Sequence, residues 1–450
     1  MRVNIGDPII FKEMIYSVYP DREIDIPNGI TIDSRLVEIG DIYLPIKGAN
    51  EDGHNFIDNA VSAGASLVFS EIDISVSIPW IQVDSTLSAL KKLATKYRQQ
   101  FSVPVLGITG SNGKTTTKEL LVHILSASKK CMNTSGNHNN TIGLPLSIFT
   151  IEKDDKLAIL EMGTSEPGEI KNLCEISEPQ MGIITNVLPA HIESFKTTHS
   201  IAEEKSQLFQ SLSENGIAFV NLDDGFISEM DTIANPITYS FTELSDFTGN
   251  FSNTENGTHL MINNTEIHLP YGGKIMAQNA LAAFTVASTL GLSENIIKNR
   301  IESFRAPPGR YEVLNMGDHT VINDCYNANL SSAISGLEAF VEISPNSRHI
   351  AVIGDMFELG DLAVSHHNQL GEFIKKININ AVFATGELTA HMIEHMKETI
   401  QKHNIFIQHY FTKLELIDSL KSYLLPGDII YIKGSRGMQM ETVIYEVFQD

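Results

Sequence analysis

The stretch Gly110-Ser111-Asn112-Gly113-Lys114-Thr115-Thr116 decides how the chain is expected to fold. It follows the apolar run 105–108, which is typical of a buried parallel strand, and it precedes residues 118–125, whose apolar positions recur at helical spacing. A glycine-rich turn between a strand and a helix presents backbone N–H groups and the positive end of the helix dipole to phosphate oxygens. The stretch therefore predicts a nucleotide-binding loop in an α/β fold.

Two side chains give this loop its expected chemistry. Lys114 would add a full positive charge beside the phosphates, and Thr115 would offer its hydroxyl to Mg²⁺. The general Walker pattern has a glycine five places before Gly113, where Ile108 stands, so the loop matches a shorter Gly-x-x-Gly-Lys-Thr form. The alternative is a solvated Gly/Ser turn with an incidental lysine, and the strand before the loop and the helix after it favour the nucleotide site.

The composition limits the classes of function. A chain of 450 residues suggests about three domains, and a net charge of -23 argues against a nucleic-acid partner, which would require a basic face. No stretch reaches the roughly 20 apolar residues of a membrane span, and the first residues have no signal-peptide core, so we expect a soluble cytoplasmic protein without a membrane partner. Three widely separated cysteines favour free thiols over disulfides or a zinc site.

The pattern of strands and helices predicts three α/β domains. Residues 1–103 form a small α/β unit that ends near Ser102-Val103-Pro104. Residues 104–308 repeat strand then helix, which is the pattern of a parallel sheet, and end at the Ala306-Pro307-Pro308-Gly309 linker. Residues 309–450 form a second doubly wound, Rossmann-like domain.

One segment of the central domain differs from this pattern. Between about residues 237 and 275, short alternating runs are broken by Asn256-Gly257 and Asn263-Asn264, which are typical turn sequences. We expect antiparallel hairpins inserted in the α/β core.

Polar residues follow several of the predicted strands. Glu161 ends one strand, Thr185-Asn186 and then His191 follow the next, and residues 221–224 follow a third. The carboxyl ends of parallel strands meet at one edge of a sheet, so these groups could converge on the phosphate loop. In the N-terminal unit, Asp33, Ser34, Arg35 and Lys47 also stand at strand ends, although taken alone they favour surface salt bridges over ligand contacts.

Five motifs occur in order along the chain: residues 109–116, the Gly-Asn-His-Asn-Asn-Thr-Ile-Gly-Leu-Pro stretch at 136–145, Glu161-Met162-Gly163, Arg310-Tyr311-Glu312 and Tyr326-Asn327-Ala328-Asn329. Together they resemble the Mur ligases, the ATP-dependent amide-forming enzymes of peptidoglycan precursor synthesis, and the resemblance covers essentially the whole chain. Within that family, Tyr-Asn-Ala-Asn, Gly-Asp-Met-Phe-Glu-Leu-Gly and Lys-Gly-Ser-Arg-Gly-Met look like the loops of members that add D-alanyl-D-alanine to UDP-N-acetylmuramoyl-tripeptide.

The resemblance implies a reaction and a division of labour between domains. ATP would phosphorylate the terminal carboxylate of the UDP-linked tripeptide, and the amine of D-alanyl-D-alanine would attack the acyl phosphate, giving the UDP-muramoyl-pentapeptide, ADP and phosphate. Residues 1–103 would bind the UDP-sugar, residues 104–308 would bind ATP, and residues 309–450 would close over ATP and bind the acceptor. The partners would be these small molecules alone, with the enzyme a monomer.

The resemblance also implies roles for individual residues. Positions matching the ATP site are Gly110, Ser111, Asn112, Gly113, Lys114, Thr115, Thr116, Asn279, Arg310 and Asp324. Positions expected to bind the substrates are Asp33, Ser34, Arg35, Lys47, Asn139, Asn140, Tyr326, Asn327, Asn329 and Arg436. Catalytic roles fall to Lys114, Lys205, His191 and Glu161, of which the last three, with Thr115, match the positions that hold Mg²⁺.

Two of the expected metal positions carry unusual ligands. Without the resemblance, His191 favours a packing role, because imidazole is an uncommon ligand for a hard cation. Lys205 stands where the family has a lysine that reacts with CO₂ to form a carbamate, an anion that can help to hold Mg²⁺. Its sequence context alone, between Glu203-Glu204 and Ser206, favours a solvated helix lysine.

Three positions depart from the family pattern. Ile275-Met276 replaces a common His-Asn ahead of Asn279, Leu330 replaces the usual proline after Tyr-Asn-Ala-Asn, and His138 is atypical in its loop. The first departure affects the expected adenine contacts. Alternatives are a diamino-acid-adding member of the family acting on the UDP-muramoyl-dipeptide, although its Asp-Asn-Pro-Arg loop is absent, a folylpolyglutamate synthetase, or a P-loop regulatory ATPase without ligase chemistry.

Overall fold

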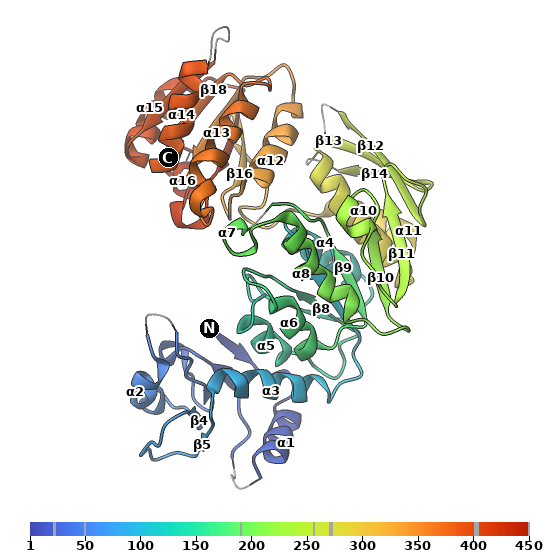
Figure 1. The fold of residues 1–450 in the computed structure, drawn as a ribbon, viewed down its shortest axis with the longest axis vertical. Helices are drawn as coiled ribbons and strands as arrows, with labels where there is room; N and C mark the ends of the chain where they lie inside the picture. Colours follow the sequence, from blue (N-terminus) through green and yellow to red (C-terminus); the bar gives the residue numbers. More distant parts are fainter. Residues whose placement is uncertain are drawn as a thin grey trace.

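Three β-sheets, each with its own helices, organise the computed structural model (Figure 1). The structure describes residues 1–20, 24–48, 51–189, 191–254, 257–269, 273–399 and 405–448. The predicted three-domain α/β architecture is therefore confirmed. Among the described residues, no helix is both long and apolar enough to cross a membrane.

The N-terminal sheet has five strands in the order β1-β2-β3-β4-β5, all parallel except the β1–β2 pair. Its elements are β1 (Arg2–Asn4), α1 (Pro8–Val18), β2 (Gly29–Thr31), η1 (Ser34–Leu36), β3 (Ile42–Tyr43), η2 (Gly53–Phe56), α2 (Ile57–Ser62), β4 (Leu67–Ser70), β5 (Trp80–Gln82) and α3 (Thr86–Arg98). Sequence analysis did not predict β1 or β5, both of which are three residues long.

The central sheet has nine strands in the order β14-β13-β12-β11-β10-β9-β6-β8-β7. Its strands through β11 are β6 (Val105–Thr109), β7 (Cys131–Asn133), β8 (Leu157–Glu161), β9 (Met181–Ile184), β10 (Ile217–Asn221) and β11 (Asn235–Ser240), and every pairing among them is parallel. Helices cover both faces: α5 (Gly143–Ile148), α6 (Glu169–Ser177) and α8 (Thr198–Gln210) on one, and α4 (Lys114–Leu125), α10 (Gly273–Thr289) and α11 (Glu294–Ser303) on the other. Two short helices, α7 (Ile192–Phe195) and α9 (Gly225–Ser228), follow β9 and β10.

The predicted hairpins do not form an insertion. Strands β12 (Phe247–Thr254), β13 (Gly257–Ile262) and β14 (Thr265–Leu269) form two successive antiparallel pairs, as predicted. However, β12 pairs in parallel with β11 and so extends the central sheet at its edge (Figure 1). The turn at Asn263-Asn264 is present, with Asn263 at a φ of 49°. Asn256, in the other predicted turn, lies outside the described residues.

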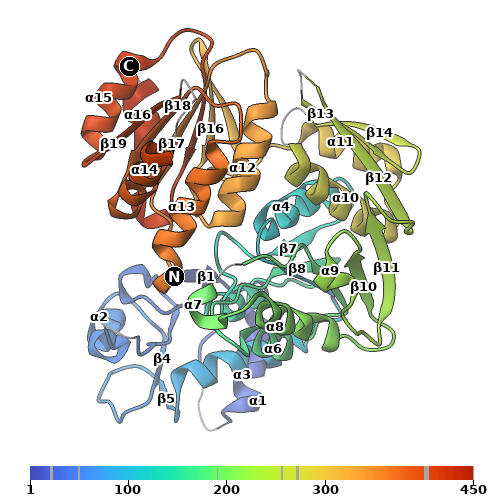
Figure 2. The same cartoon turned by 45° about the horizontal axis from the view of Figure 1, so that its top comes forward.

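The C-terminal sheet has six strands in the order β15-β16-β20-β17-β18-β19, parallel except for β15–β16. Helices α12 to α14 cover one face and α15 and α16 the other, which confirms a doubly wound domain (Figure 2). The elements are β15 (Glu312–Met316), β16 (His319–Asp324), α12 (Leu330–Glu342), β17 (His349–Gly354), η3 (Gly360–Leu362), α13 (Ala363–Ile374), β18 (Ala381–Thr385), α14 (Glu387–Thr399), β19 (Phe406–Tyr410), α15 (Lys413–Tyr423), β20 (Ile429–Lys433), η4 (Arg436–Met438) and α16 (Glu441–Phe448).

Arg98, the last residue of α3, links the end of the N-terminal domain to helix α6 of the central domain. Its side chain is 4% exposed, and Nε, Nη1 and Nη2 donate to the carbonyl oxygens of Ser177, Phe101 and Val103 at 3.0, 2.8 and 2.8 Å. A guanidinium has five N–H donors in a planar fork, so one side chain can satisfy three carbonyls that converge from different directions.

We expect Arg98→Ala to lower the free energy of unfolding by about 3 kcal/mol, because it leaves buried carbonyl oxygens without donors. Lys96→Ala is the matched control, since the Lys96 ammonium donates only to the exposed Gln99 side chain. Differential scanning calorimetry of both variants measures the change. Equal melting temperatures for the two variants would show that Arg98 does not fasten the domains.

Candidate active site

A cavity of about 400 Å³ lies between the central sheet and the C-terminal domain. Both domains contribute to its wall. From the central domain come Ser111, Asn112, Gly113, Lys114, Thr115, Thr116, Asn137, Asn139, Asn140, Glu161, Gly163, Thr164, Ser165, Glu169, His191, Ile275, Met276 and Asn279. From the C-terminal side come Gly309, Arg310, Tyr311, Asp324, Tyr326, Asn327, Asn329, Ser332, Gly336 and Lys433.

The phosphate loop connects β6 to α4, and two of its glycines are required by close neighbours. Gly110 has a φ of +147°, and a Cβ there would stand 1.9 Å from the Thr185 hydroxyl oxygen. Gly113 has a φ of +81°, and its Cβ would stand 2.7 Å from Asn279 Oδ1. An L side chain at either position would combine a rarely adopted backbone conformation with a clash.

Lys114 begins α4 and is held by its own loop. Its Nζ donates to the carbonyl oxygens of Gly110 and Ser111 at 2.7 and 3.4 Å. Burial lowers the pKa of Lys114, although the nearby Glu161 carboxylate opposes this shift. A cation among carbonyl dipoles, with the N-terminus of a helix beside it, is an arrangement suited to phosphate oxygens.

Glu161 has one carboxylate oxygen free at the floor of the cavity. Its Oε1 accepts from Thr115 Oγ1 at 3.1 Å and from Asn139 Nδ2 at 2.8 Å, whereas Oε2 is buried without a hydrogen-bond partner. A buried carboxylate oxygen in this state costs free energy unless a cation is present. The hydroxyl and carboxylate are oxygen ligands of the type that Mg²⁺ prefers, so these residues fit that ion.

The protein alone does not supply a complete set of metal ligands at this position. Across the parts of the chain that the structure describes, no three His, Cys, Asp or Glu side chains cluster in a way that could hold a metal ion. Mg²⁺ commonly keeps several waters and takes its other ligands from substrate phosphates, so one or two protein ligands suffice.

Lys205, on α8, lies behind the phosphate loop and outside the main cavity. With Gly110, Lys114 and His191 it lines a second cavity of about 10 Å³. The side chain is 4% exposed, and burial together with the charge of Lys114 lowers its pKa well below the usual range. The prediction of a solvated helix lysine from the sequence context alone is therefore wrong.

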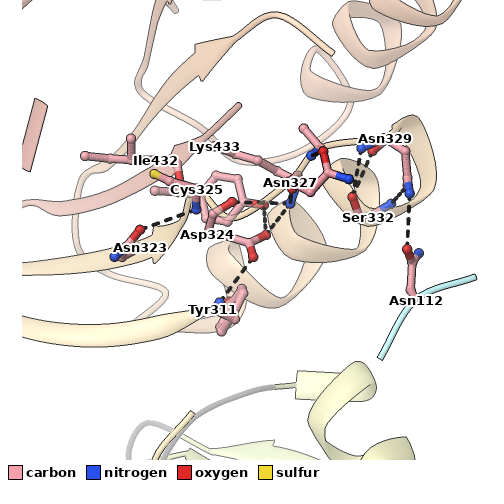
Figure 3. A network of polar contacts seen from close by, with 12 residues as sticks. Asn112, Tyr311, Asn323, Asp324, Cys325, Asn327, Asn329, Ser332, Ile432 and Lys433 are labelled. Atoms are coloured by element: carbon pink, nitrogen blue, oxygen red, sulfur yellow. Dashed lines mark hydrogen bonds and ion pairs between the residues drawn. The ribbon is translucent and has the colours of Figure 1, made fainter. Parts of the chain in front are cut away.

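Asp324 is the centre of a polar network at the C-terminal wall of the cavity (Figure 3). Its Oδ1 accepts from the backbone N–H of Tyr311 at 3.1 Å, and its Oδ2 accepts from Lys433 Nζ at 2.6 Å and from Tyr431 Oη at 2.8 Å. Lys433 Nζ also donates to the carbonyl oxygen of Asn327 at 3.1 Å. The network joins the ends of β16 and β20 and fixes the Tyr326–Asn329 loop between them.

Arg310 of the C-terminal domain and Asn279 of the central domain both line the cavity. The Arg310 guanidinium lies over the Tyr326 ring, 3.7 Å from its centroid, a cation–π contact that holds the cation at the wall. Asn279 is buried on α10, and its Oδ1 accepts from Thr117 Oγ1 at 3.3 Å. Ile275 and Met276, which depart from the family pattern, also line the cavity.

A direct link joins the phosphate loop to the C-terminal domain. Asn112 Nδ2 donates to Ser331 Oγ at 3.1 Å, and Asn329 Nδ2 donates to Asn112 Oδ1 at 3.2 Å (Figure 3). Asn329 is also the N-cap of α12, where its side chain accepts from the Ser332 N–H at 2.8 Å. The Asn329 side chain thus contacts protein groups at both of its polar atoms.

Some predicted site residues lie away from this cavity. Arg436 is exposed and forms an ion pair with Glu441 at 2.6 Å. Asp33 and Arg35 form an ion pair with each other at 2.7 Å, at the end of β2 in the N-terminal sheet, near Ser34, while Lys47 follows β3 at the same sheet edge. The ion pair matches the salt-bridge alternative weighed from the sequence.

The strand-end residues 221–224 serve the fold rather than the cavity. Asp223 accepts hydrogen bonds from Ser240, Phe241 and Thr242, and Asp224 caps α9. Conversely, sequence reasoning did not place Lys433, Glu169 or Ser332 in the site. The position of Lys433 directly after a predicted strand could have indicated its place in the site. The sequence around Glu169 and Ser332 carries no such signal.

Comparisons with known proteins identify the class. Sequence profiles described as the catalytic domain of the Mur ligase family, the Mur ligase middle domain, and the Mur ligase glutamate ligase domain match residues 27–98, 108–287 and 309–436. The chain belongs to the Mur ligase family.

Particular relatives narrow the comparison. The UDP-N-acetylmuramoyl-tripeptide--D-alanyl-D-alanine ligase of Bacillus subtilis is 32% identical, over 96% of this chain and 95% of that protein. A crystal structure of MurF from Acinetobacter baumannii superposes with a TM-score of 0.88 at 27% identity, covering 100% of both chains. MurF ligase from Thermotoga maritima in complex with ADP has a TM-score of 0.83 at 29% identity, covering 93% and 97%.

We expect Gly110→Ala to weaken ADP binding by about tenfold or more, a loss of at least about 1.4 kcal/mol, because the new methyl group meets the Thr185 hydroxyl. Titration calorimetry measures the affinity. Gly225→Ala is the control, since a Cβ there meets nothing within 4 Å. Removing the hydroxyl with Thr185→Ala should recover part of the loss in the double variant, and full ADP affinity in Gly110→Ala would contradict the loop assignment.

Proposed function

We propose that this chain joins D-alanyl-D-alanine to UDP-N-acetylmuramoyl-tripeptide, consuming ATP. The observation that carries the proposal is a single cavity lined both by the phosphate loop and by the Tyr326–Asn329 loop of the C-terminal domain. The relatives named for this reaction match the chain over nearly its full length. In this proposal residues 1–103 bind the UDP-sugar, 104–308 bind ATP, and 309–450 bind the acceptor, in a cytoplasmic monomer.

Different residues of the cavity can support different parts of the phosphoryl transfer. A carboxylate is a poor electrophile, so transfer of the ATP γ-phosphoryl to the tripeptide carboxylate supplies a leaving group. Lys114 and the loop N–H groups offset the charge on the phosphoryl oxygens, and Arg310 adds a cation from the opposite wall. The acceptor amine then attacks the acyl phosphate carbon, an amide bond forms, and phosphate leaves as the amine loses a proton.

Mg²⁺ would be held by Thr115 and Glu161, with His191 at a second position. Bound there, it would neutralise charge on the phosphate oxygens. Asn139 acts on this site indirectly, since its amide fixes the Glu161 oxygen that already accepts from Thr115. We therefore propose Asn139 as a positioning residue for Glu161 as well as part of the substrate wall.

Lys205 fits the carbamate role that the family resemblance implies. Only a neutral amine attacks CO₂, and burial beside Lys114 favours the neutral form of Lys205. The Nζ–C bond forms and one proton leaves Nζ, so the neutral amine becomes a carbamate anion. That anion would lie between Lys114 and His191, where it can support Lys114 and the metal.

The acceptor loop carries amides rather than ionic side chains. A diamino-acid acceptor has a distal charged group that needs a dedicated partner, whereas the Asn327 amide, which lines the cavity, suits peptide N–H and C=O groups. Closure of the two domains around the cavity would exclude water that otherwise hydrolyses the acyl phosphate. These features favour D-alanyl-D-alanine over the diamino-acid alternative.

Lys205→Ala should lose at least about tenfold in rate, an effect of about 1.4 kcal/mol or more, and recover in part when a small carboxylate such as formate is added. Lys171→Ala, an exposed lysine on α6, is the control and should behave as wild type. The wild type should also depend on bicarbonate. If no small acid restores activity and intact mass in bicarbonate buffer shows no added CO₂, Lys205 is a structural lysine.

A competition assay tests the acceptor. The purified enzyme receives ATP, Mg²⁺ and either UDP-muramoyl-tripeptide or UDP-muramoyl-dipeptide, with D-alanyl-D-alanine, L-lysine or diaminopimelate offered together. Mass spectrometry of the products should show the tripeptide joined to D-alanyl-D-alanine. Faster amide formation between the dipeptide and a diamino acid would overturn the assignment, and phosphate release without any amide product would favour a regulatory ATPase.

A further inference from the structure

His191 of the central domain meets Glu358 of the C-terminal domain. His191 Nδ1 lies 3.2 Å from Glu358 Oε2. His191 is the N-cap of α7, and Glu358 lies in the loop between β17 and η3. The helix η3, which follows this loop, also lies against α7, since a Cβ on Gly360 would stand 3.3 Å from Glu193 Cγ.

The energetics of this pair do not match a role in stability. The two side chains are 34% and 68% exposed, and exposed ion pairs contribute about 0 to 1 kcal/mol. Both residues have left-handed backbone conformations, with φ of 51° at His191 and 63° at Glu358. Such conformations cost about 1 to 3 kcal/mol each in non-glycine residues and concentrate at functional sites. The free-energy cost of the two backbone conformations therefore exceeds the stabilisation that the ion pair contributes.

The contact can instead orient the imidazole ring of His191. A histidine that binds a metal through one ring nitrogen usually donates the other N–H to a carboxylate, which fixes the tautomer and the orientation of the ring. Here Glu358 takes Nδ1, so Nε2 remains available on a ring that lines both the main cavity and the smaller Lys205 cavity. No hydrogen bond of Nε2 is found within the described parts of the chain.

We propose that Glu358 is a positioning residue that orients His191 for Mg²⁺. Because Glu358 belongs to the C-terminal domain, the metal position is complete only when that domain lies against the central one. Metal binding and domain closure are thereby coupled through one contact. This inference rests on the proposed role of His191 in the ligase reaction.

The experiment compares Mn²⁺ binding to the ADP complex by electron paramagnetic resonance, using Mn²⁺ as the probe for the Mg²⁺ position. Glu358→Ala should weaken Mn²⁺ binding by about tenfold or more, in the range seen when residues that support metal ligands are removed. Glu358→Gln should lose less, because its amide oxygen still accepts from Nδ1–H. Glu193→Gln, in the same contact but without a bond to the His191 ring, should match wild type.

Two further measurements separate positioning from a merely structural contact. In His191→Ala, adding Glu358→Ala should weaken Mn²⁺ binding no further, because the carboxylate has no ring to orient. Small-angle scattering of each ADP complex reports domain closure. Unchanged Mn²⁺ affinity in Glu358→Ala overturns the proposal, whether or not the scattering curve changes. Losses of Mn²⁺ affinity that add up in the double variant also overturn it. If the wild-type enzyme forms no amide product, the proposed function is wrong. The Mn²⁺ affinities would still show whether Glu358 positions His191.

Discussion

Hydrogen bonds from the end of β9 to the phosphate loop determine where the rest of the site can be. Thr185 Oγ1 donates to the Asn112 carbonyl oxygen at 2.6 Å, and Asn186 Oδ1 accepts from the Asn112 N–H at 2.9 Å. The Asn112 backbone is thus fixed from the central sheet, while its side chain reaches Asn329 and Ser331 in the C-terminal domain. One residue of the loop therefore links the central sheet to the C-terminal wall of the cavity.

Charge is distributed in the molecule to suit anionic substrates in spite of a net charge of -23. The wall of the cavity gathers Lys114, Arg310 and Lys433, with Lys205 behind the loop. Lys433 is already paired with Asp324, and it also holds the Tyr326–Asn329 loop through the Asn327 carbonyl oxygen. Among the described residues, the Lys114 ammonium donates to backbone carbonyls and has no carboxylate paired with it, so it remains the cation that phosphate oxygens can engage.

The sequence predicted what local patterns encode and missed what depends on tertiary contacts. The strand, loop and helix around Lys114 were predicted because apolar periodicity and glycines act over short range. The antiparallel hairpins predicted between residues 237 and 275 are present, but their placement as an insertion was wrong, because a hairpin pattern does not show that β12 pairs in parallel with β11. The burial of Lys205, the free oxygen of Glu161 and the pairing of His191 with Glu358 arise between elements far apart in sequence. Positions after predicted strands pointed to Glu161 and His191, whereas only the family resemblance pointed to Lys205.

The two domain junctions differ in kind. The N-terminal and central domains share one hydrophobic core, in which the rings of Phe11, Tyr97 and Phe149 pack together. The cores of the C-terminal domain contain no residue of the other two among the described residues. Its junction includes polar pairs, Asn112 with Asn329 and His191 with Glu358, each worth about 1 kcal/mol or less. A junction without a shared core can open and close again without exposing one, whereas the N-terminal domain shares its core with the central domain that carries the phosphate loop.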